Sequence, residues 1–257
     1  KTHDEDELPI VAPPSDEEWE RRKLLSEYRS LKCQRTKEIN KLHAIFEHNG
    51  YTQFVRKDMR SEKNRANILP LLKGYEKEEA ERLVERLNLL EKQIERLLQK
   101  INAEVENDGK IQKVMTVPGI GPITALAYVA YVGDVNRFDN AHQVSNFIGF
   151  VPKVDNSCTI CRSGHTTKKG NPLLRSLLVQ AAWSTVKSKN GGALRDKYKY
   201  MAESRCIGKG KSIVTIARKL GELLYLILKT DQEYKPQKFI TPELKISKLA
   251  EDALECS

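Results

Sequence analysis

The chain has 257 residues, of which 39% are hydrophobic, enough to bury one large core or two modest ones. No apolar run reaches the ~18 to 20 residues that a membrane-spanning helix needs, so a membrane-spanning protein is excluded and no membrane partner is expected. The formal net charge is +9 and it is uneven, because residues 153–219 hold fifteen Lys and Arg against three acidic residues. Such a basic segment favours a polyanionic partner.

Residues 1–14 are predicted to be a linker, because an acidic cluster is followed by Pro9, Pro13 and Pro14. Asp6 and its neighbours offer the oxygen ligands that a hard divalent cation prefers, although a solvated acidic linker has the same composition. The chain starts with a lysine rather than a methionine. We therefore expect a native N-terminal portion to precede it.

Residues 15–110 are predicted to form a long helical hairpin of the coiled-coil type. Ser15 is a helix N-cap whose capping box is completed by Glu18, and helical spacing continues to about Asn49-Gly50. A second long helix follows Gly74 and carries an apolar seam with heptad spacing. This seam would join copies of the chain into a homo-oligomer, a dimer or tetramer, or would close the hairpin within one chain. Its members are Leu83, Leu87, Leu90, Ile94, Leu97 and Ile101.

The segment between these two helices, residues 51–72, is polar and basic. Pro70 limits any helix there, because proline lacks the backbone N–H that a helix interior uses. We therefore expect a connection without a long helix.

A Pro-Gly-hydrophobic-Gly turn at residues 118–121 opens the second predicted domain, residues 111–232. Helical spacing on both sides of the turn predicts that two helices meet there at a sharp corner. Gly119 and Gly121 allow positive φ and leave backbone N–H groups uncovered at the start of the next helix, which suits a phosphate. This is the helix-hairpin-helix pattern of proteins that hold a nucleic-acid backbone. An ordinary helix corner with a glycine cap would give the same residues.

The rest of this domain is predicted to be helical, apart from one long loop. Residues 139–149 form a short helix that places Val144, Phe147 and Ile148 on the core. Residues 150–170 have little periodicity, and a connection of that length is usually functional or disordered. Further helices are expected at residues 173–186, 194–204 and 213–229, followed by a flexible tail at residues 233–257. The predicted fold class is mainly α.

Ser157, inside this long loop, is the candidate nucleophile. A serine hydroxyl needs a base, a metal or charge-stabilising donors to attack a phosphate. A basic turn at residues 167–171, with nearby arginines, would supply such donors to a nucleic-acid backbone. The cationic and polar candidates are Arg162, Lys168, Lys169, Asn171 and Arg175. The same residues would also surround an ordinary loop serine without a catalytic role.

Two other motifs in the basic segment partly match known binding motifs. Cys158 and Cys161 form a C-x-x-C pair, but no second pair completes a zinc site. The five cysteines are odd in number and lack a framework spacing, which indicates reduced thiols and a cytoplasmic location. The run Gly208–Ser212 ends like a P-loop but lacks the first glycine and the preceding strand. Lys209 and Lys211 are therefore predicted to contact a nucleic-acid backbone.

Five separated blocks of the chain resemble, in order and spacing, the C-terminal transposase domain of the insertion sequence 110 family. The helix around Arg35-Thr36 and Asn40–His43 is similar to that family's helical region. The blocks are Val117–Ala125, Arg137-Phe138, Phe147–Pro152, Ser157, and Lys168–Asn171 with Leu174-Arg175.

The resemblance implies a DNA recombinase that is associated with DNA in a prokaryotic cytoplasm. Family members combine a RuvC-like domain, which holds Mg²⁺ through four acidic residues, with a coiled coil and a domain bearing a catalytic serine, here Ser157. A structured bridge RNA guides them to DNA. The family's last two acidic ligands map onto residues 1–6, so that Asp6 and His3 are the metal candidates and residues 1–14 are the end of a truncated RuvC-like domain.

The sequence departs from the family pattern at two places. His3 stands where an acid is expected, and Cys158 follows the serine where a glycine is common. With the first two acids missing, we expect this fragment alone to cut DNA poorly.

Two functions of other classes remain open at this point. A non-catalytic helix-hairpin-helix module with a dimerising coiled coil would bind DNA without needing Ser157. A helical interaction protein would use only the seam, although the basic segment weighs against it.

Overall fold

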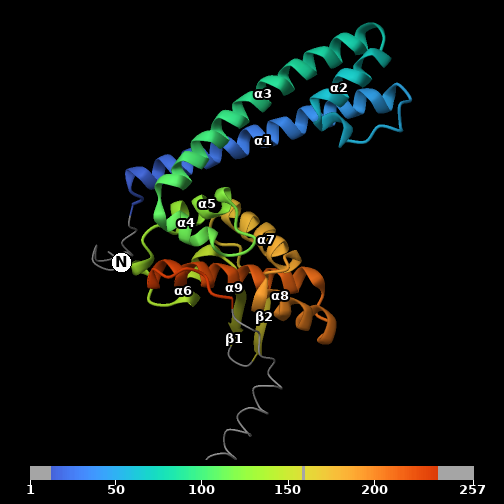
Figure 1. Cartoon of the computed structure of the whole chain (residues 1–257). Coiled ribbons are helices and arrows are strands. Elements are labelled where there is room, and N and C mark those ends of the chain that lie inside the picture. Colours follow the sequence, from blue (N-terminus) through green and yellow to red (C-terminus); the bar gives the residue numbers. More distant parts are fainter. Residues whose placement is uncertain (1–12, 158–159, 237–257) are drawn as a thin grey trace, which may run out of the picture. The chain divides into compact units, whose positions relative to one another are not determined.

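The computed structural model describes residues 13–157 and 160–236, and the described fold is mainly helical, as predicted (Figure 1). The chain divides into two compact units. One is the helical hairpin of residues 22–104, and the other combines residues 1–21 with residues 105–257. The predicted tail beyond residue 236 lies outside the described residues.

Two long helices make up the hairpin, α1 (Asp16–His48) and α3 (Gly74–Asn107). The predicted capping box is confirmed: the Ser15 backbone N–H donates to the Glu18 carboxylate at 3.3 Å, and the Glu18 N–H donates to Ser15 Oγ at 3.2 Å. Both orphan donors at this helix start are thereby satisfied. The helix bounds also agree with the predicted starts and ends to within a few residues.

The connection between α1 and α3 contains more helix than predicted. A 3₁₀ turn, η2 (Asp58–Arg60), precedes the seven-residue helix α2 (Glu62–Ile68), which is followed by η3 (Leu69–Leu71). Pro70 lies in the first turn of η3, where the missing N–H costs nothing, so it ends α2 without preventing it. The short helix was missed because seven residues show too little periodicity.

The apolar seam of α3 is buried within this single chain at its N-terminal end. Leu83 and Leu87 pack into one hydrophobic cluster with α1 and with the connection. These two leucines are therefore covered without a second copy of the chain. The other buried members are Ile39, Leu42, Phe46, Met59, Ile68, Leu72 and Ala80.

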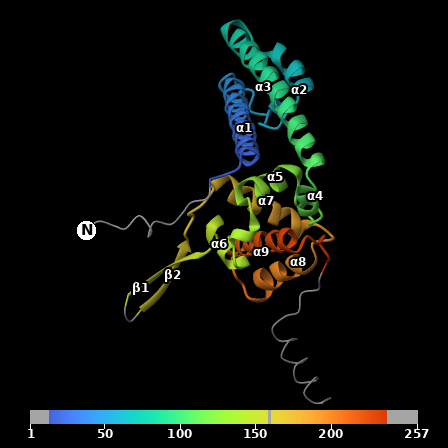
Figure 2. The ribbon, with the colours of Figure 1, turned by 90° about the vertical axis from the view of Figure 1, so that its left-hand side faces the viewer.

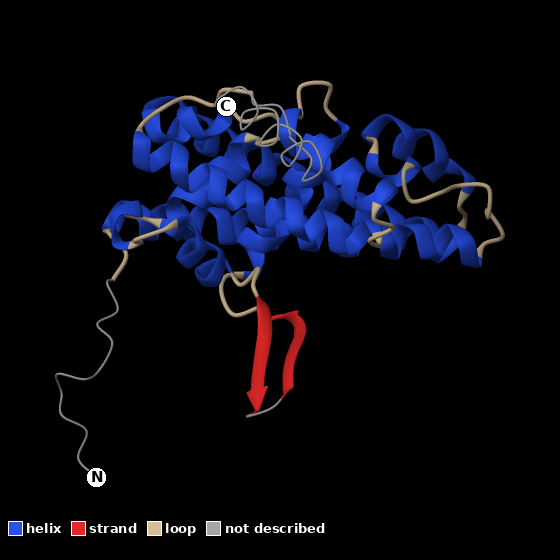
Figure 3. Cartoon of the chain, turned by 90° about the horizontal axis from the view of Figure 1, so that it is seen from below, coloured by secondary structure: helices blue, strands red, loops and turns tan. Residues whose placement is uncertain are grey.

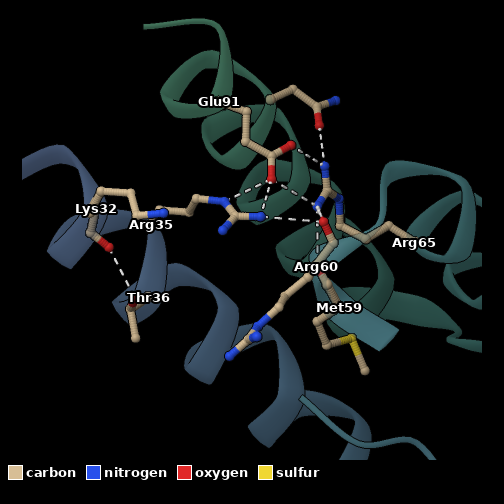
Figure 4. A network of polar contacts seen from close by, with 8 residues as sticks. Lys32, Arg35, Thr36, Met59, Arg60, Arg65 and Glu91 are labelled. Carbon is tan, nitrogen blue, oxygen red and sulfur yellow. Dashed lines mark hydrogen bonds and ion pairs between the residues drawn. The ribbon is translucent and has the colours of Figure 1, made fainter. Parts of the chain in front are cut away.

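A buried arginine joins the connection to α3 (Figure 4). The side chain of Arg65 has no exposed surface, and its Nη2 donates to Glu91 Oε2 at 2.7 Å and to the Asn88 side chain at 2.8 Å. Arg35 of α1 reaches the same carboxylate, from Nε to Oε1 at 2.9 Å. The main-chain oxygen of Met59 accepts from Arg65 Nη1. Glu91 therefore ties three segments of the hairpin together.

The second unit is built around α9 (Lys209–Thr230), which contacts most of the other helices of the unit. Its buried face includes Ile213, Ile216, Leu220 and Leu224. Burying such a stripe against several helices supplies much of the stabilisation of the unit. The surrounding elements are α4 (Gly109–Met115), α5 (Pro122–Val132), η4 (Val135–Arg137), α6 (Ala141–Ile148), α7 (Pro172–Lys187), α8 (Gly192–Lys199) and the π-helical turn η5 (Tyr200–Ser204).

The predicted loop at residues 150–170 contains a β-hairpin instead. Strand β1 (Pro152–Ser157) pairs antiparallel with β2 (Ile160–Thr166), and an irregularity in the register lies between Pro152 and Val154. Figure 2 and Figure 3 both show the two strands extending from the helices of the unit. The hairpin was missed because its strands lack the alternation of apolar and polar residues that a half-buried sheet shows.

The short helix predicted at residues 139–149 is present as α6, but one of its side chains lies differently. Val144 and Ile148 are buried as expected, whereas Phe147 is 39% exposed. The Phe147 ring packs edge-on against Phe138, with ring centroids 5.5 Å apart, and the Arg137 guanidinium lies 4.6 Å from its centroid. Phe147 therefore covers the edge of the core rather than filling it.

No helix in the described part of the chain is long and apolar enough to cross a membrane.

Candidate nucleic-acid interface

The basic turn lies at the N-terminus of α7. Lys168 and Lys169 are exposed, and Lys168 adopts the left-handed region with φ +53°. Asn171 is the N-cap of α7, and its side-chain oxygen accepts from the N–H groups of Leu173 and Leu174 at 2.8 and 3.1 Å. Asn171 was predicted to contact nucleic acid, but its side-chain oxygen caps the helix instead. The two lysines are the residues that this turn presents to solvent.

Arg175 holds the basic turn against α6. Its Nη1 donates to the main-chain oxygen of Ile148 at 3.1 Å and to that of Gly170 at 2.9 Å. A single guanidinium nitrogen therefore joins the end of α6 to the start of α7. The sequence predicted Arg175 to contact nucleic acid, and the structure shows that this nitrogen binds main-chain oxygens.

Two glycines allow the turn to approach α6 closely. A Cβ at Gly149 would lie 2.1 Å from the main-chain oxygen of Lys169, and a Cβ at Gly170 would lie 2.3 Å from that of Phe147. Both glycines also have positive φ, +86° and +123°. Only glycine combines a positive φ with the absence of a Cβ. The close approach of the Lys169 main chain to α6 therefore depends on these two glycines.

The turn between α4 and α5 lies where the sequence predicted it, but its two glycines differ. Gly119 has φ +93°, and a Cβ there would lie 2.5 Å from Thr185 Oγ1 of α7. Thr185 Oγ1 also donates to the Pro118 main-chain oxygen at 2.7 Å. Gly121 has φ −99° and open space at its Cβ position, so the expected positive φ is wrong there. Gly119 is required for packing on α7, and Gly121 is the N-cap of α5 without a side-chain cap.

Ser157 is the last residue of β1, and its Cα pairs with that of Ile160 across the hairpin. Arg162 pairs in the same way with Asp155. The predicted nucleophile thus lies at the end of the hairpin that is remote from α6 and α7, next to residues 158–159. Cys158 falls outside the described residues, as do His3 and Asp6.

Lys209 and Lys211 lie in the first turn of α9 and are both exposed. The sequence placed the start of this helix four residues later, at Ile213. The preceding Gly208 offers no side-chain cap. These lysines therefore project from a helix rather than from a loop.

A cationic cluster around Glu222 was not found from the sequence. Glu222 accepts from Lys219 Nζ at 2.6 Å and from Ser145 Oγ at 2.9 Å, and Arg218 Nε lies 3.7 Å from the carboxylate. Burial raises the pKa of the Glu222 carboxyl, but the hydrogen bonds from Lys219 and Ser145 outweigh this effect and hold the pKa below its ordinary value. The i,i+4 spacing of Arg218 and Glu222 is visible in the sequence, whereas the contact with Ser145 depends on the fold.

Lys197 of α8 adds a third positive charge to this cluster. Its partial burial lowers the pKa of the lysine, and the nearby charges of Lys219 and Arg218 lower it further. Helix α8 packs against α9, and its residues Ala193 and Leu194 line one cavity together with Lys219 and Glu222.

Among the residues that the structure describes, no group of three or more His, Cys, Asp or Glu side chains is placed to hold a metal ion. Cys206 is an exposed free thiol.

Part of the chain is similar to known transposases. Residues 111–199 match the model of the transposase IS116/IS110/IS902 family, which confirms the predicted resemblance. A protein of Pseudomonas aeruginosa described as a probable family 20 transposase is 37% identical over 105 residues, or 41% of this chain and 31% of the relative. The transposase for insertion sequence element IS1111A of Coxiella burnetii is 30% identical over 139 residues, or 53% of this chain and 38% of the relative. The chain thus spans about a third of the length of these curated relatives.

Proposed function

We propose that this chain, which carries the domain of the IS116/IS110/IS902 transposase family at residues 111–199, cuts and rejoins DNA as part of a transposase. The observation that carries the proposal is that the matched segment contains Ser157 and also the exposed Lys168 and Lys169, which Arg175 fixes at the base of the hairpin. A transposase acts on a polyanion, and the basic segment has the charge that such a substrate needs.

Ser157 is the proposed nucleophile. Its Oγ would attack a phosphorus atom of the DNA backbone, so that an Oγ–P bond forms while the bond from phosphorus to one strand end breaks. The departing oxygen takes a proton and becomes a hydroxyl. Because the phosphoserine ester conserves the energy of the phosphodiester, the reverse attack by a strand-end hydroxyl rejoins DNA without a nucleotide cofactor. Arg162, on the opposite strand of the same hairpin, would stabilise the charge on this phosphate, whereas Lys168 and Lys169, beyond the other end of the hairpin, would hold the DNA backbone at another phosphate.

The proposed reaction also uses Mg²⁺, whose proposed ligands lie outside the described part of the chain. The ligands would be the acids of a RuvC-like domain together with Asp6 and His3. The described residues do not fit the ion, since they hold no suitable cluster of ligands.

DNA, a bridge RNA and further copies of the chain are the proposed partners. The turn at Gly119 and Gly121 would act as a helix-hairpin-helix motif, with the uncapped start of α5 directed to a phosphate. Oligomerisation would have to use surfaces of α3 other than Leu83 and Leu87, which are already covered within one chain.

The decisive experiment replaces the nucleophile in the full-length protein. Ser157→Ala should abolish strand exchange and the covalent protein–DNA adduct while leaving DNA binding intact. Ser163→Ala is the matched control, since it removes a hydroxyl from the opposite strand of the same hairpin. Recombination that persists in the Ser157 variant would remove the nucleophile assignment.

A double variant separates the transposase from the non-catalytic DNA-binding module. Lys168→Gln with Lys169→Gln should weaken DNA binding and reduce the slope of log affinity against log salt by about 0.9 for each lost phosphate contact. If this double variant loses function while Ser157→Ala retains it, the binding module is the correct function. An unchanged salt slope would instead exclude the two lysines from the interface.

A further inference from the structure

The cations around Glu222 are not balanced by the carboxylates near them. Arg218 and Lys219 share Glu222 as the one carboxylate that the described residues bring within ion-pair distance of them. Lys197 lies on α8, which packs against α9 and lines a cavity together with Lys219 and Glu222. Three cations and one carboxylate leave an excess of two positive charges in a small volume, which is unfavourable unless an anion joins the cluster.

Arg218 also has a donor without an acceptor. Its Nε is buried and makes no hydrogen bond within the described structure, and the carboxylate of Glu222 is too distant at 3.7 Å. The side chain as a whole remains 30% exposed, and that of Lys219 is 40% exposed. The missing hydrogen bond leaves the guanidinium charge incompletely neutralised, so an anionic oxygen at the exposed part of the Arg218 side chain would be stabilised.

Helix α6 connects this cluster to the basic turn. Ser145 of α6 donates to Glu222 at 2.9 Å, and Ile148, three residues along the same helix, accepts from Arg175. Three residues of α-helix rise about 4.5 Å. Glu222 of the cluster and Arg175 at the basic turn therefore contact α6 within about one helical turn of each other.

We propose that Lys197, Arg218 and Lys219 form a second binding site for nucleic-acid backbone phosphate, next to the basic turn. The inference rests on the proposed function, because it assigns further contacts to the same nucleic acid. Glu222 neutralises part of the charge of Lys219 and Arg218 in the free protein. When a phosphate binds, the two cations pair with the phosphate and less with Glu222. Removing Glu222 therefore strengthens binding.

The test measures binding of the 257-residue chain to a DNA duplex and to a single-stranded RNA of equal length, over a series of salt concentrations. Glu222→Gln keeps an acceptor for Ser145 and removes the negative charge, so affinity should rise roughly threefold to tenfold and the salt slope should increase. Lys197→Gln should lower affinity and reduce the slope by about 0.9 on the duplex or about 0.7 on the single strand. The nucleic acid that shows these changes identifies the source of the phosphate.

Lys92→Gln with Lys100→Gln is the matched control, since it removes exposed lysines from α3. Urea unfolding verifies that each variant is folded, and if Glu222→Gln is not folded, Lys197→Gln alone decides. Unchanged affinity and slope in both variants, with normal binding by the unaltered chain, overturns the second phosphate site and leaves the proposed function standing. Failure of the unaltered chain to bind either nucleic acid overturns both.

Discussion

Arg65 and Glu91 form an ion pair at 2.7 Å in which the arginine side chain has no exposed surface and the glutamate side chain is 29% exposed. Most arginines that are buried in this way are paired, because an uncompensated charge in a protein interior is costly. The pair joins the connection between the long helices to α3 and lies beside the hydrophobic cluster of the hairpin. The stability of the hairpin should therefore depend on it.

Arg65→Met should destabilise the chain by roughly 2 to 4 kcal/mol, because it removes the hydrogen bonds to Glu91 and Asn88 and leaves the main-chain oxygen of Met59 without its donor. Urea unfolding measures the loss. Arg82→Met is the control, since Arg82 is half exposed and lies 3.9 Å from Glu78, and it should cost under about 0.5 kcal/mol. Equal losses in the two variants would contradict a structural role for the buried arginine.

The Glu91 pair should also make stability depend on pH. Burial raises the pKa of the Glu91 carboxyl, but the hydrogen bonds from Arg65 and Arg35 outweigh this effect and lower the pKa below the ordinary 4.5. The folded state therefore binds the proton more weakly than the unfolded chain does. The contribution of the pair is present above the ordinary pKa and is lost as the pH falls through the lowered one.

Comparison of the unaltered chain with Glu91→Gln tests this sign. The difference in their unfolding free energies should be largest near neutral pH and should shrink between about pH 5 and about pH 3. Glu81→Gln, on the exposed surface of α3, should leave the pH profile unchanged. A difference that grows on acidification would contradict the assignment.

The two glycines of the turn between α4 and α5 should respond differently to the same change. Gly119→Ala places a methyl group against Thr185 at a positive φ, and we expect a loss of about 2 to 4 kcal/mol. Gly121→Ala enters open space at a φ that any residue adopts, and it should change stability by less than about 0.5 kcal/mol. Thermal unfolding measures both. A tolerated alanine at position 119 would show that the turn is free to move away from α7.

Asn171 offers a way to separate stability from nucleic-acid binding. Asn171→Ala removes the N-cap of α7 and should cost about 1 kcal/mol. Asn171→Asp keeps the cap but adds a negative charge next to Lys168 and Lys169, so the protein should stay as stable while DNA binding weakens. Unfolding and binding assays on both variants check the two effects. Normal DNA binding by the aspartate variant would show that the phosphate lies elsewhere.

Local patterns were sufficient to predict the long helices. The capping box at Ser15 and Glu18 and the apolar seam of α3 depend on residues close in sequence, and both are confirmed. The β-hairpin was not predictable in this way, because its strands are held by cross-strand pairing rather than by periodic burial. The short helix α2 was not predictable either, because seven residues show too little periodicity and because its position depends on the contact of Arg65 with the distant Glu91.

The candidate interface was predictable by residue type but not by role. The sequence correctly placed lysines at an exposed turn that opens a helix. It did not show that Arg175 binds main-chain oxygens or that Asn171 caps α7, because both roles depend on where α6 and α7 meet. The charge cluster around Glu222 joins three helices and was missed for that reason as well.

The closeness of Gly149 and Gly170 to opposing main-chain oxygens has a practical consequence for engineering. A library that varies the turn can exchange Lys169, whose side chain is exposed, and can exchange Lys168 for residues that tolerate its positive φ. It must leave both glycines unchanged, because a methyl group at either position would force the end of α6 and the basic turn apart. The charge of this surface can thus be redesigned, while the backbone conformation at the two glycines has to be kept.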